Sequence, residues 1–295
     1  MWCWVKKINQ NSEWVGKQLA KFCGVTNREI GIAGKKDKHA ETYQWISIHL
    51  PQKETPDFSK IDILGVSVRR ITRHNKKLQT GGLSGNQFTL TLNKFDGCKN
   101  TLEQKLQTIQ QQGFPNYFGE QRFGNDFENL TKATDLFTQK IRPKRHQKTM
   151  YLSAARSWIF NEILSARIKA TNWNRYERGD IFQLEGSQKW FVDDFSEKLK
   201  ERIQTQDIHP TGALVGKGKL LTSHDIFKLE NDIIKQHPIW LTGLSTAGMK
   251  QERRALRVLP KNLSWSWLDN NTLTLAFRLP TGSYATMLVR ELVKT

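Results

Sequence analysis

Near the start of the chain, apolar residues recur with the spacing of an α-helix. Val15, Leu19 and Phe22 fall at positions i, i+4 and i+7, which places them on one helix face. Ser12 precedes this pattern as a candidate N-cap, and Gly24 follows it as a stop signal. We therefore predict an amphipathic helix between these two residues.

Further along, apolar and polar residues alternate with period two, the pattern of a β-strand with one buried face. The alternation covers residues 43–50, 63–71 and 87–92. We expect these three strands to form one sheet, with the loop at residues 34–42 at one rim.

The middle of the chain is richer in helical patterns than either end. Helical spacing covers residues 102–109, about 125–140, about 150–170 and 223–236. The end is sheet-like again at 263–267 and 273–279, followed by a terminal helix at 281–293. A sheet that is interrupted and then resumed predicts an α+β fold with an inserted domain.

Two segments in this middle part are predicted as loops. Residues 142–148 combine Pro143 with a high density of basic side chains, so we interpret them as a loop that could contact phosphates. Residues 209–218 contain Pro210 and several glycines, and a purely structural role is the safer interpretation for them.

The composition narrows the class of partner. Lys and Arg number 46 against 28 Asp and Glu, which gives a formal net charge of +18 and predicts a polyanionic partner. No apolar run approaches the length of a membrane span, and no signal peptide is recognisable. The three cysteines are far apart and lack metal-ligand spacing, which fits a reducing cytoplasm rather than a disulfide framework or a zinc site.

The segment 34–44 is the strongest candidate for chemistry. It sets Asp37 among Lys35, Lys36 and Lys38, directly ahead of a predicted strand. Neighbouring lysines favour an ionised carboxylate, so Asp37 could act as a nucleophile or an electrostatic anchor while the lysines contact phosphates. From spacing alone, a solvated charge run in a surface loop is the more ordinary interpretation, because charged clusters are usually surface.

Two further segments carry candidate contacts to RNA. Asn86 and Phe88 open a predicted strand with an amide and an aromatic ring, which could bind and stack an unstacked base. Residues 116–124 interleave aromatic residues with Gln121 and Arg122 between glycines. A core role for Phe88 and a packed hinge at 116–124 are the structural alternatives.

Familiar catalytic motifs of other classes are excluded. The Gly34–Lys35 pair lacks the earlier glycine of a phosphate-binding loop, where Glu29 stands, and Lys36 replaces the required Ser or Thr. The seven histidines form no HxxxH pair, and no Gly-x-Ser-x-Gly motif is present.

Taken together, seven ordered motifs resemble the TruD family of tRNA pseudouridine synthases from about Trp4 to Val293. The matching pieces are residues 33–44, 85–88, 115–124, 152–157, 209–213, 252–255 and 279–286. The resemblance implies an α+β chain in which a catalytic domain of pseudouridine-synthase fold, a mixed and largely antiparallel sheet with helices, spans residues 1–112 and 257–295. An α/β TRUD insertion domain would span residues 113–256.

The resemblance also implies the reaction and the site. A tRNA uridine, uridine 13 of a glutamate tRNA in the family, would be isomerised to pseudouridine with Asp37 as the catalytic aspartate. Lys36, Asn86, Phe88, Gln121 and Arg122 would bind the substrate. No metal or other cofactor is implied, tRNA is the expected partner, and we expect a cytoplasmic monomer.

One departure from the family concerns the N-terminus. The resemblance implies about forty further residues before Met1, including an Asp-Phe-x-Val-x-Glu-like strand that helps to build the pocket. The alternative hypothesis is therefore a truncated, catalytically impaired relative that binds tRNA or acts as an RNA chaperone.

Overall fold

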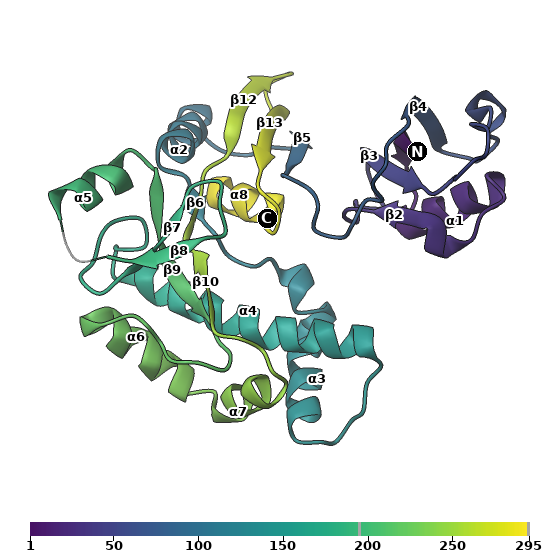
Figure 1. Cartoon of the computed structure of the whole chain (residues 1–295). Helices are drawn as coiled ribbons and strands as arrows, with labels where there is room; N and C mark the ends of the chain where they lie inside the picture. Colours follow the sequence, from purple (N-terminus) through teal and green to yellow (C-terminus); the bar gives the residue numbers. More distant parts are fainter. Residues whose placement is uncertain (194–195, 294–295) are drawn as a thin grey trace. The chain divides into compact units, whose positions relative to one another are not determined.

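The computed structural model describes residues 1–193 and 196–293, and the chain divides into two compact units, Met1–Asn86 and Gln87–Thr295 (Figure 1). Its class is α+β, as predicted from the alternation of sheet and helix patterns. Within the described part of the chain, no helix is long and apolar enough to cross a membrane.

The first unit is a four-stranded antiparallel sheet with one helix packed on it. The strand order is β2-β3-β1-β4, with β1 Trp2–Ile8, β2 Ile30–Ile32, β3 Glu41–Ile48 and β4 Val66–Thr72. Helix α1 Ser12–Phe22 buries Val15 and Leu19 against Cys3, Val5 and Ile46 of the sheet. Short 3-10 turns lie at Asn27–Glu29 and Phe58–Lys60.

Two sequence predictions about this unit were wrong in detail. The predicted N-cap of α1, Ser12, is the first helical residue, and Asn11 caps the helix by accepting from the backbone N–H of Glu13 at 2.8 Å. The strand at 86–92 does not join the first sheet, because it pairs within the second unit. Strand β1 was not predicted at all.

Strand β5 Asn86–Leu92 begins at the last residue of the first unit, and its other residues belong to the second unit. It pairs in the order β12-β13-β5 with β12 Lys261–Trp267 and β13 Leu273–Leu279. Helices α2 Lys99–Gln112 and α8 Ala285–Leu292 supply buried leucines to the same apolar core. A short antiparallel pair, β6 Phe114–Pro115 with β11 Arg257–Val258, leads into and out of the intervening segment.

A second sheet in this unit has the order β10-β9-β7-β8. Its strands are β7 Ile181–Leu184, β8 Trp190–Val192, β9 Ile208–Leu214 and β10 Glu252–Ala255. The long helix α4 Arg145–Lys169 packs along β9, and α3 Glu128–Phe137, α5 Glu197–Gln204, α6 His224–Lys235 and α7 Pro238–Thr246 complete the segment (Figure 1). Single 3-10 turns lie at Glu120–Arg122 and Asn125–Phe127.

Both predicted loops of this segment were wrong in part. Helix α4 begins at Arg145, so only the first residues of the basic segment 142–148 are loop. Residues 209–214 belong to the buried strand β9, where His209 is 2% exposed and its ring contacts Glu185 at 2.9 Å. Helices α5 and α7 were not predicted.

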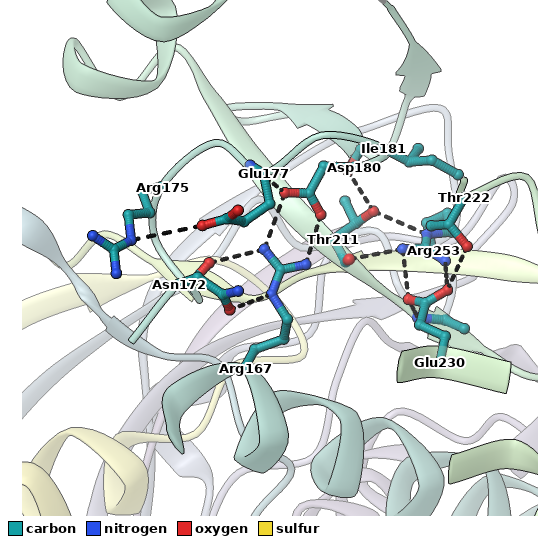
Figure 2. A network of polar contacts seen from close by, with 11 residues as sticks. Arg167, Asn172, Arg175, Glu177, Asp180, Ile181, Thr211, Thr222, Glu230 and Arg253 are labelled. Atoms are coloured by element: carbon teal, nitrogen blue, oxygen red, sulfur yellow. Dashed lines mark hydrogen bonds and ion pairs between the residues drawn. The ribbon is translucent and has the colours of Figure 1, made fainter. Parts of the chain in front are cut away.

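Two buried ion pairs hold the second sheet to its helices (Figure 2). On one side, Arg167 of α4 makes a bidentate contact with Asp180 at 2.6 and 3.0 Å. On the other, Arg253 of β10 makes a bidentate contact with Glu230 of α6, both bonds at 2.8 Å. Arg253 also donates to the backbone carbonyl of Thr211 at 2.7 Å, so one side chain ties β9, β10 and α6 together.

Candidate active site

Asp37 lies on the loop that connects β2 to β3 in the first unit. Its side chain is exposed, and it makes no hydrogen bond or ion pair with the residues that the structure describes. The backbone around it is held firmly, because the N–H of Lys36 donates to the Ser12 hydroxyl at 3.0 Å and the carbonyl of Asp37 accepts from the Lys7 ammonium at 2.6 Å. The loop therefore exposes the Asp37 carboxylate to solvent while its backbone is held by these two hydrogen bonds.

Lys7 is the support that sequence reasoning missed. It follows Cys3 and Val5 on the apolar face of β1 and is 0% exposed. Burial lowers the pKa of the Lys7 ammonium, while the nearby Asp37 charge opposes that shift. The sequence does carry a signal for this role, because Lys7 falls on the apolar side of the period-two pattern Cys3-Val5-Lys7. A prediction of strand β1 would therefore have identified Lys7 as a buried lysine.

Lys36 and Asn86, two predicted substrate-binding residues, are brought together. The Lys36 ammonium donates to the side-chain oxygen of Asn86 across fifty positions of sequence. Burial lowers the pKa of Lys36, and the charge of Asp37 partly counteracts this. A cation and an amide thus stand next to the aspartate loop within the same unit.

The other predicted site residues fall in the second unit. Phe88 packs against the core cluster there, with its ring 5.5 Å from that of Phe277 in a stacked arrangement. Gln121 is exposed on a 3-10 turn. Arg122 donates to the hydroxyls of Tyr284 and Ser153, each at 3.1 Å, so its guanidinium is held by side chains from two distant segments.

Arg254 organises the same aromatic segment as Arg122. Its guanidinium lies 4.0 Å from the centre of the Phe118 ring and donates to the Asn116 side chain and, at 2.9 Å, to the Gly282 carbonyl. Three motifs that the sequence analysis singled out, at 116–124, 252–255 and 279–286, therefore meet around one cation.

The described part of the chain contains no group of three or more His, Cys, Asp or Glu side chains placed to hold a metal ion. The chemistry available on the aspartate loop is that of a carboxylate flanked by lysines.

An exposed aspartate on a lysine-rich loop of an antiparallel sheet, in a chain of net charge +18, favours the class of enzymes that act on a polyanion. Comparison with known proteins is more specific. The profile of the tRNA pseudouridine synthase D (TruD) family matches residues 1–133 and 128–292. The chain belongs to this family of isomerases.

Individual relatives agree over almost the whole chain. A tRNA pseudouridine synthase D from Hydrogenovibrio crunogenus is 57% identical over 293 residues, which are 99% of this chain and 85% of that protein. One from Xanthomonas campestris pv. campestris is 43% identical over 98% of this chain and 83% of that protein. The crystal structure of a putative TruD from Methanosarcina mazei, 22% identical, superposes with a TM-score of 0.72 and covers 100% of this chain and 87% of that one, which confirms the predicted fold.

Proposed function

We propose that this chain isomerises uridine to pseudouridine in tRNA with Asp37 as its catalytic carboxylate, and that its target is uridine 13 of a glutamate tRNA. The observation that carries the proposal is the exposed Asp37 side chain on a backbone held from below by Lys7 and Ser12. A carboxylate fixed in this way can approach a bound nucleotide without first giving up a protein partner.

The reaction needs little besides such a group. The bond between C1′ and N1 of the uridine breaks, a bond between C1′ and C5 forms, C5 loses a proton and N1 gains one, so the atoms balance without an oxidant or a co-reactant. Asp37 would offer an anionic oxygen to the sugar or to the ring. The base must leave the stack first, which costs a few kcal/mol in nucleic acids generally.

Further residues of both units would contact the same tRNA. Lys36, oriented by Asn86, would contact a phosphate or a carbonyl of the displaced base. In the second unit, Arg122 and the exposed Gln121 would bind the RNA backbone, and Phe88 would stack on the flipped base or on a group that holds it. The division into a catalytic domain at 1–112 and 257–295 and an insertion at 113–256 is part of the same proposal.

The alternative of a silent RNA-binding relative has less support, because the relatives named above are called synthases and the aspartate loop is present in full.

The test is tritium release from a glutamate tRNA transcript labelled at C5 of its uridines, since isomerisation frees the C5 hydrogen. Asp37→Asn should reduce release to the background level while tRNA affinity stays close to that of the parent, because the amide keeps the size but loses the anionic oxygen. Asp62→Asn, at another exposed aspartate of the same unit, is the matched control and should remain active.

Turnover by Asp37→Asn equal to that of the control would disprove the catalytic role of Asp37. A parent that releases tritium equally well from a transcript carrying cytidine at position 13 would disprove the choice of uridine 13 alone.

A further inference from the structure

The first unit has a second face that the aspartate loop does not use. Strand β1 alternates strictly, with Cys3 and Val5 buried against α1 and Trp2, Trp4 and Lys6 on the opposite side of the sheet. The register pairs Trp4 with Trp45 and Lys6 with Tyr43. Trp2, Trp4, Tyr43 and Trp45 therefore share one face of the sheet, which we name the aromatic face.

The rings on this face contact one another, with Tyr43 exposed and Trp2, Trp4 and Trp45 half-buried. Trp4 lies 5.2 Å from Trp45 and 6.2 Å from Tyr43, and Tyr43 is 41% exposed. Trp2 is covered on one side by His74, whose ring is stacked on it at 3.9 Å. The three tryptophans are half-buried and lie outside the apolar core cluster of this unit, so part of each ring surface reaches solvent.

Basic side chains border the rings. Lys6 stands 5.7 Å from the centre of the Tyr43 ring and is paired with Glu41 at 2.8 Å. A register shift between Trp4 and Val5 in the pairing of β1 with β4 sets Arg69 as an extra residue beside Arg70, which is the register partner of Trp4. Both arginines are exposed, so the face combines ring surfaces with positive charge.

We propose that the aromatic face binds unpaired nucleotides of RNA, with bases stacked on Trp4, Tyr43 and Trp45 and phosphates against Arg69 and Arg70. Bases of single-stranded RNA stack on exposed aromatic side chains of sheets, and the neighbouring cations suit a phosphate backbone. Because the proposal extends the proposed function to nucleotides that do not react, it assigns this unit a role in holding the substrate in addition to isomerising it.

The choice of RNA over other occupants follows from charge. A protein surface that covered these rings would need acidic side chains opposite two adjacent arginines, and a second copy of this basic chain would bring arginines against arginines. A single RNA strand supplies ring surfaces and negative charge together.

The test measures binding of a fluorescein-labelled ten-nucleotide oligouridylate by fluorescence anisotropy. Salt of about 0.3 M reduces the contribution of phosphate contacts, so stacking dominates the difference between variants. Trp4→Ala and Tyr43→Ala should each weaken binding by about 5- to 150-fold. Tyr43→Phe, which keeps the ring, should bind like the parent.

The matched control is Trp14→Ala, because Trp14 lies on α1 and is 38% exposed, close to the 41% of Tyr43. It should leave oligouridylate binding unchanged. Asp37→Asn should also bind the oligonucleotide normally, so a failure of the aromatic face and a failure of the catalytic assignment give different results.

Equal affinity of Tyr43→Ala, Trp4→Ala and Trp14→Ala would overturn the proposal. So would a dimer in sedimentation velocity that Tyr43→Ala dissociates without any change in RNA binding, since the face would then belong to a second copy. If the alanine variants do not fold, the parent is crosslinked to an oligonucleotide containing 4-thiouridine. Adducts at Trp4, Tyr43 or Trp45 would support the proposal, and adducts only elsewhere would overturn it.

Discussion

Replacing Glu230 by glutamine should destabilise the second unit more than any exposed charge substitution. The Glu230 carboxylate accepts two bonds from Arg253, one from the backbone N–H of Ala213 at 3.0 Å and one from the Thr222 hydroxyl at 3.1 Å. The side chains of Arg253 and Glu230 are only 3% and 1% exposed. Glutamine would keep one acceptor and turn an amide N–H₂ towards the guanidinium.

The expected loss of unfolding free energy follows from the Arg253 charge that stays buried without its partner. Removing one partner of a buried ion pair typically costs about 3–5 kcal/mol, because the other charge stays buried without compensation. In urea, with a slope of about 3 kcal/mol per molar, this lowers the unfolding midpoint by about 1 M or more. An exposed pair such as Lys200 with Glu197, whose side chain is 80% exposed, contributes about 0–1 kcal/mol at most.

The assay is urea unfolding followed by tryptophan fluorescence, with Glu197→Gln as the matched control. A midpoint shift for Glu230→Gln no larger than that of the control would refute the reasoning. If Glu230→Gln cannot be purified folded, the double variant Glu230→Leu/Arg253→Met should fold and be less destabilised than the single variant, since it removes both buried charges together. It should stay less stable than the parent, because the Ala213 N–H and the Thr222 hydroxyl lose their acceptor. A double variant as unstable as the single one would show that the charges are not the cause.

Three further predictions use other parts of the chain. Phe88→Ala should slow tritium release by an amount corresponding to about 1–3 kcal/mol, while Phe88→Tyr should be tolerated; unfolding of the alanine variant would show that the ring serves only the core. The triple alanine variant of Arg142, Lys144 and Arg145 should flatten the plot of log K for tRNA against log salt by about 2 units and weaken different tRNAs alike. An unchanged slope would place this basic segment away from the RNA. Burial raises the pKa of the Cys3 thiol to about 12. The folded chain then keeps a proton that the unfolded chain loses from about pH 9 upward, so stability should fall by about 1.4 kcal/mol per pH unit from there to pH 12. In urea unfolding across that range, Cys3→Ala should reduce the fall, and an equal slope in the variant would contradict the assignment.

The sequence predicted local structure well wherever periodicity was strong. Helix α1, strand β3 and the hairpin of β12 with β13 lie where the apolar spacing placed them. The pairing of strands was harder to predict, because a period-two pattern identifies the buried face of a strand but not its neighbour in the sheet. For that reason β5 was assigned to the wrong sheet.

Composition gave a wrong prediction where proline and glycine, which usually mark loops, lie in a buried strand. Residues 209–214 carry Pro210 and Gly212 and look like a loop, yet they form the buried strand β9. The Pro210 carbonyl accepts from the backbone N–H of Leu256. A Cβ at Gly212 would lie 3.0 Å from both Leu256 and Phe160, which is tighter than an ordinary packing contact. Close packing rather than turning explains the glycine, and no single-sequence pattern distinguishes these two uses.

In the candidate site, too, some residues could be predicted from the sequence and others depend on the fold. Resemblance pointed to Asp37 and to its neighbour Lys36, and the structure places the latter against Asn86. The supports, Lys7 and Ser12, carry no motif, and their role depends on which backbone groups the fold brings beside them.

The two adjacent arginines of β10 also determine how that strand can misalign during folding. A slip by one residue moves one of the two arginines into the place of the other, so in either direction one of the two guanidinium sites still receives an arginine. Glu252, which pairs with Arg156 at 3.1 Å in the native register, makes the difference. A slip in one direction sets Arg253 against Arg156, and a slip in the other sets Glu252 against Glu230. Both misalignments bring like charges together and are therefore disfavoured. The exposed Glu252 thus favours the native register of a strand in which the neighbouring Arg253 is buried.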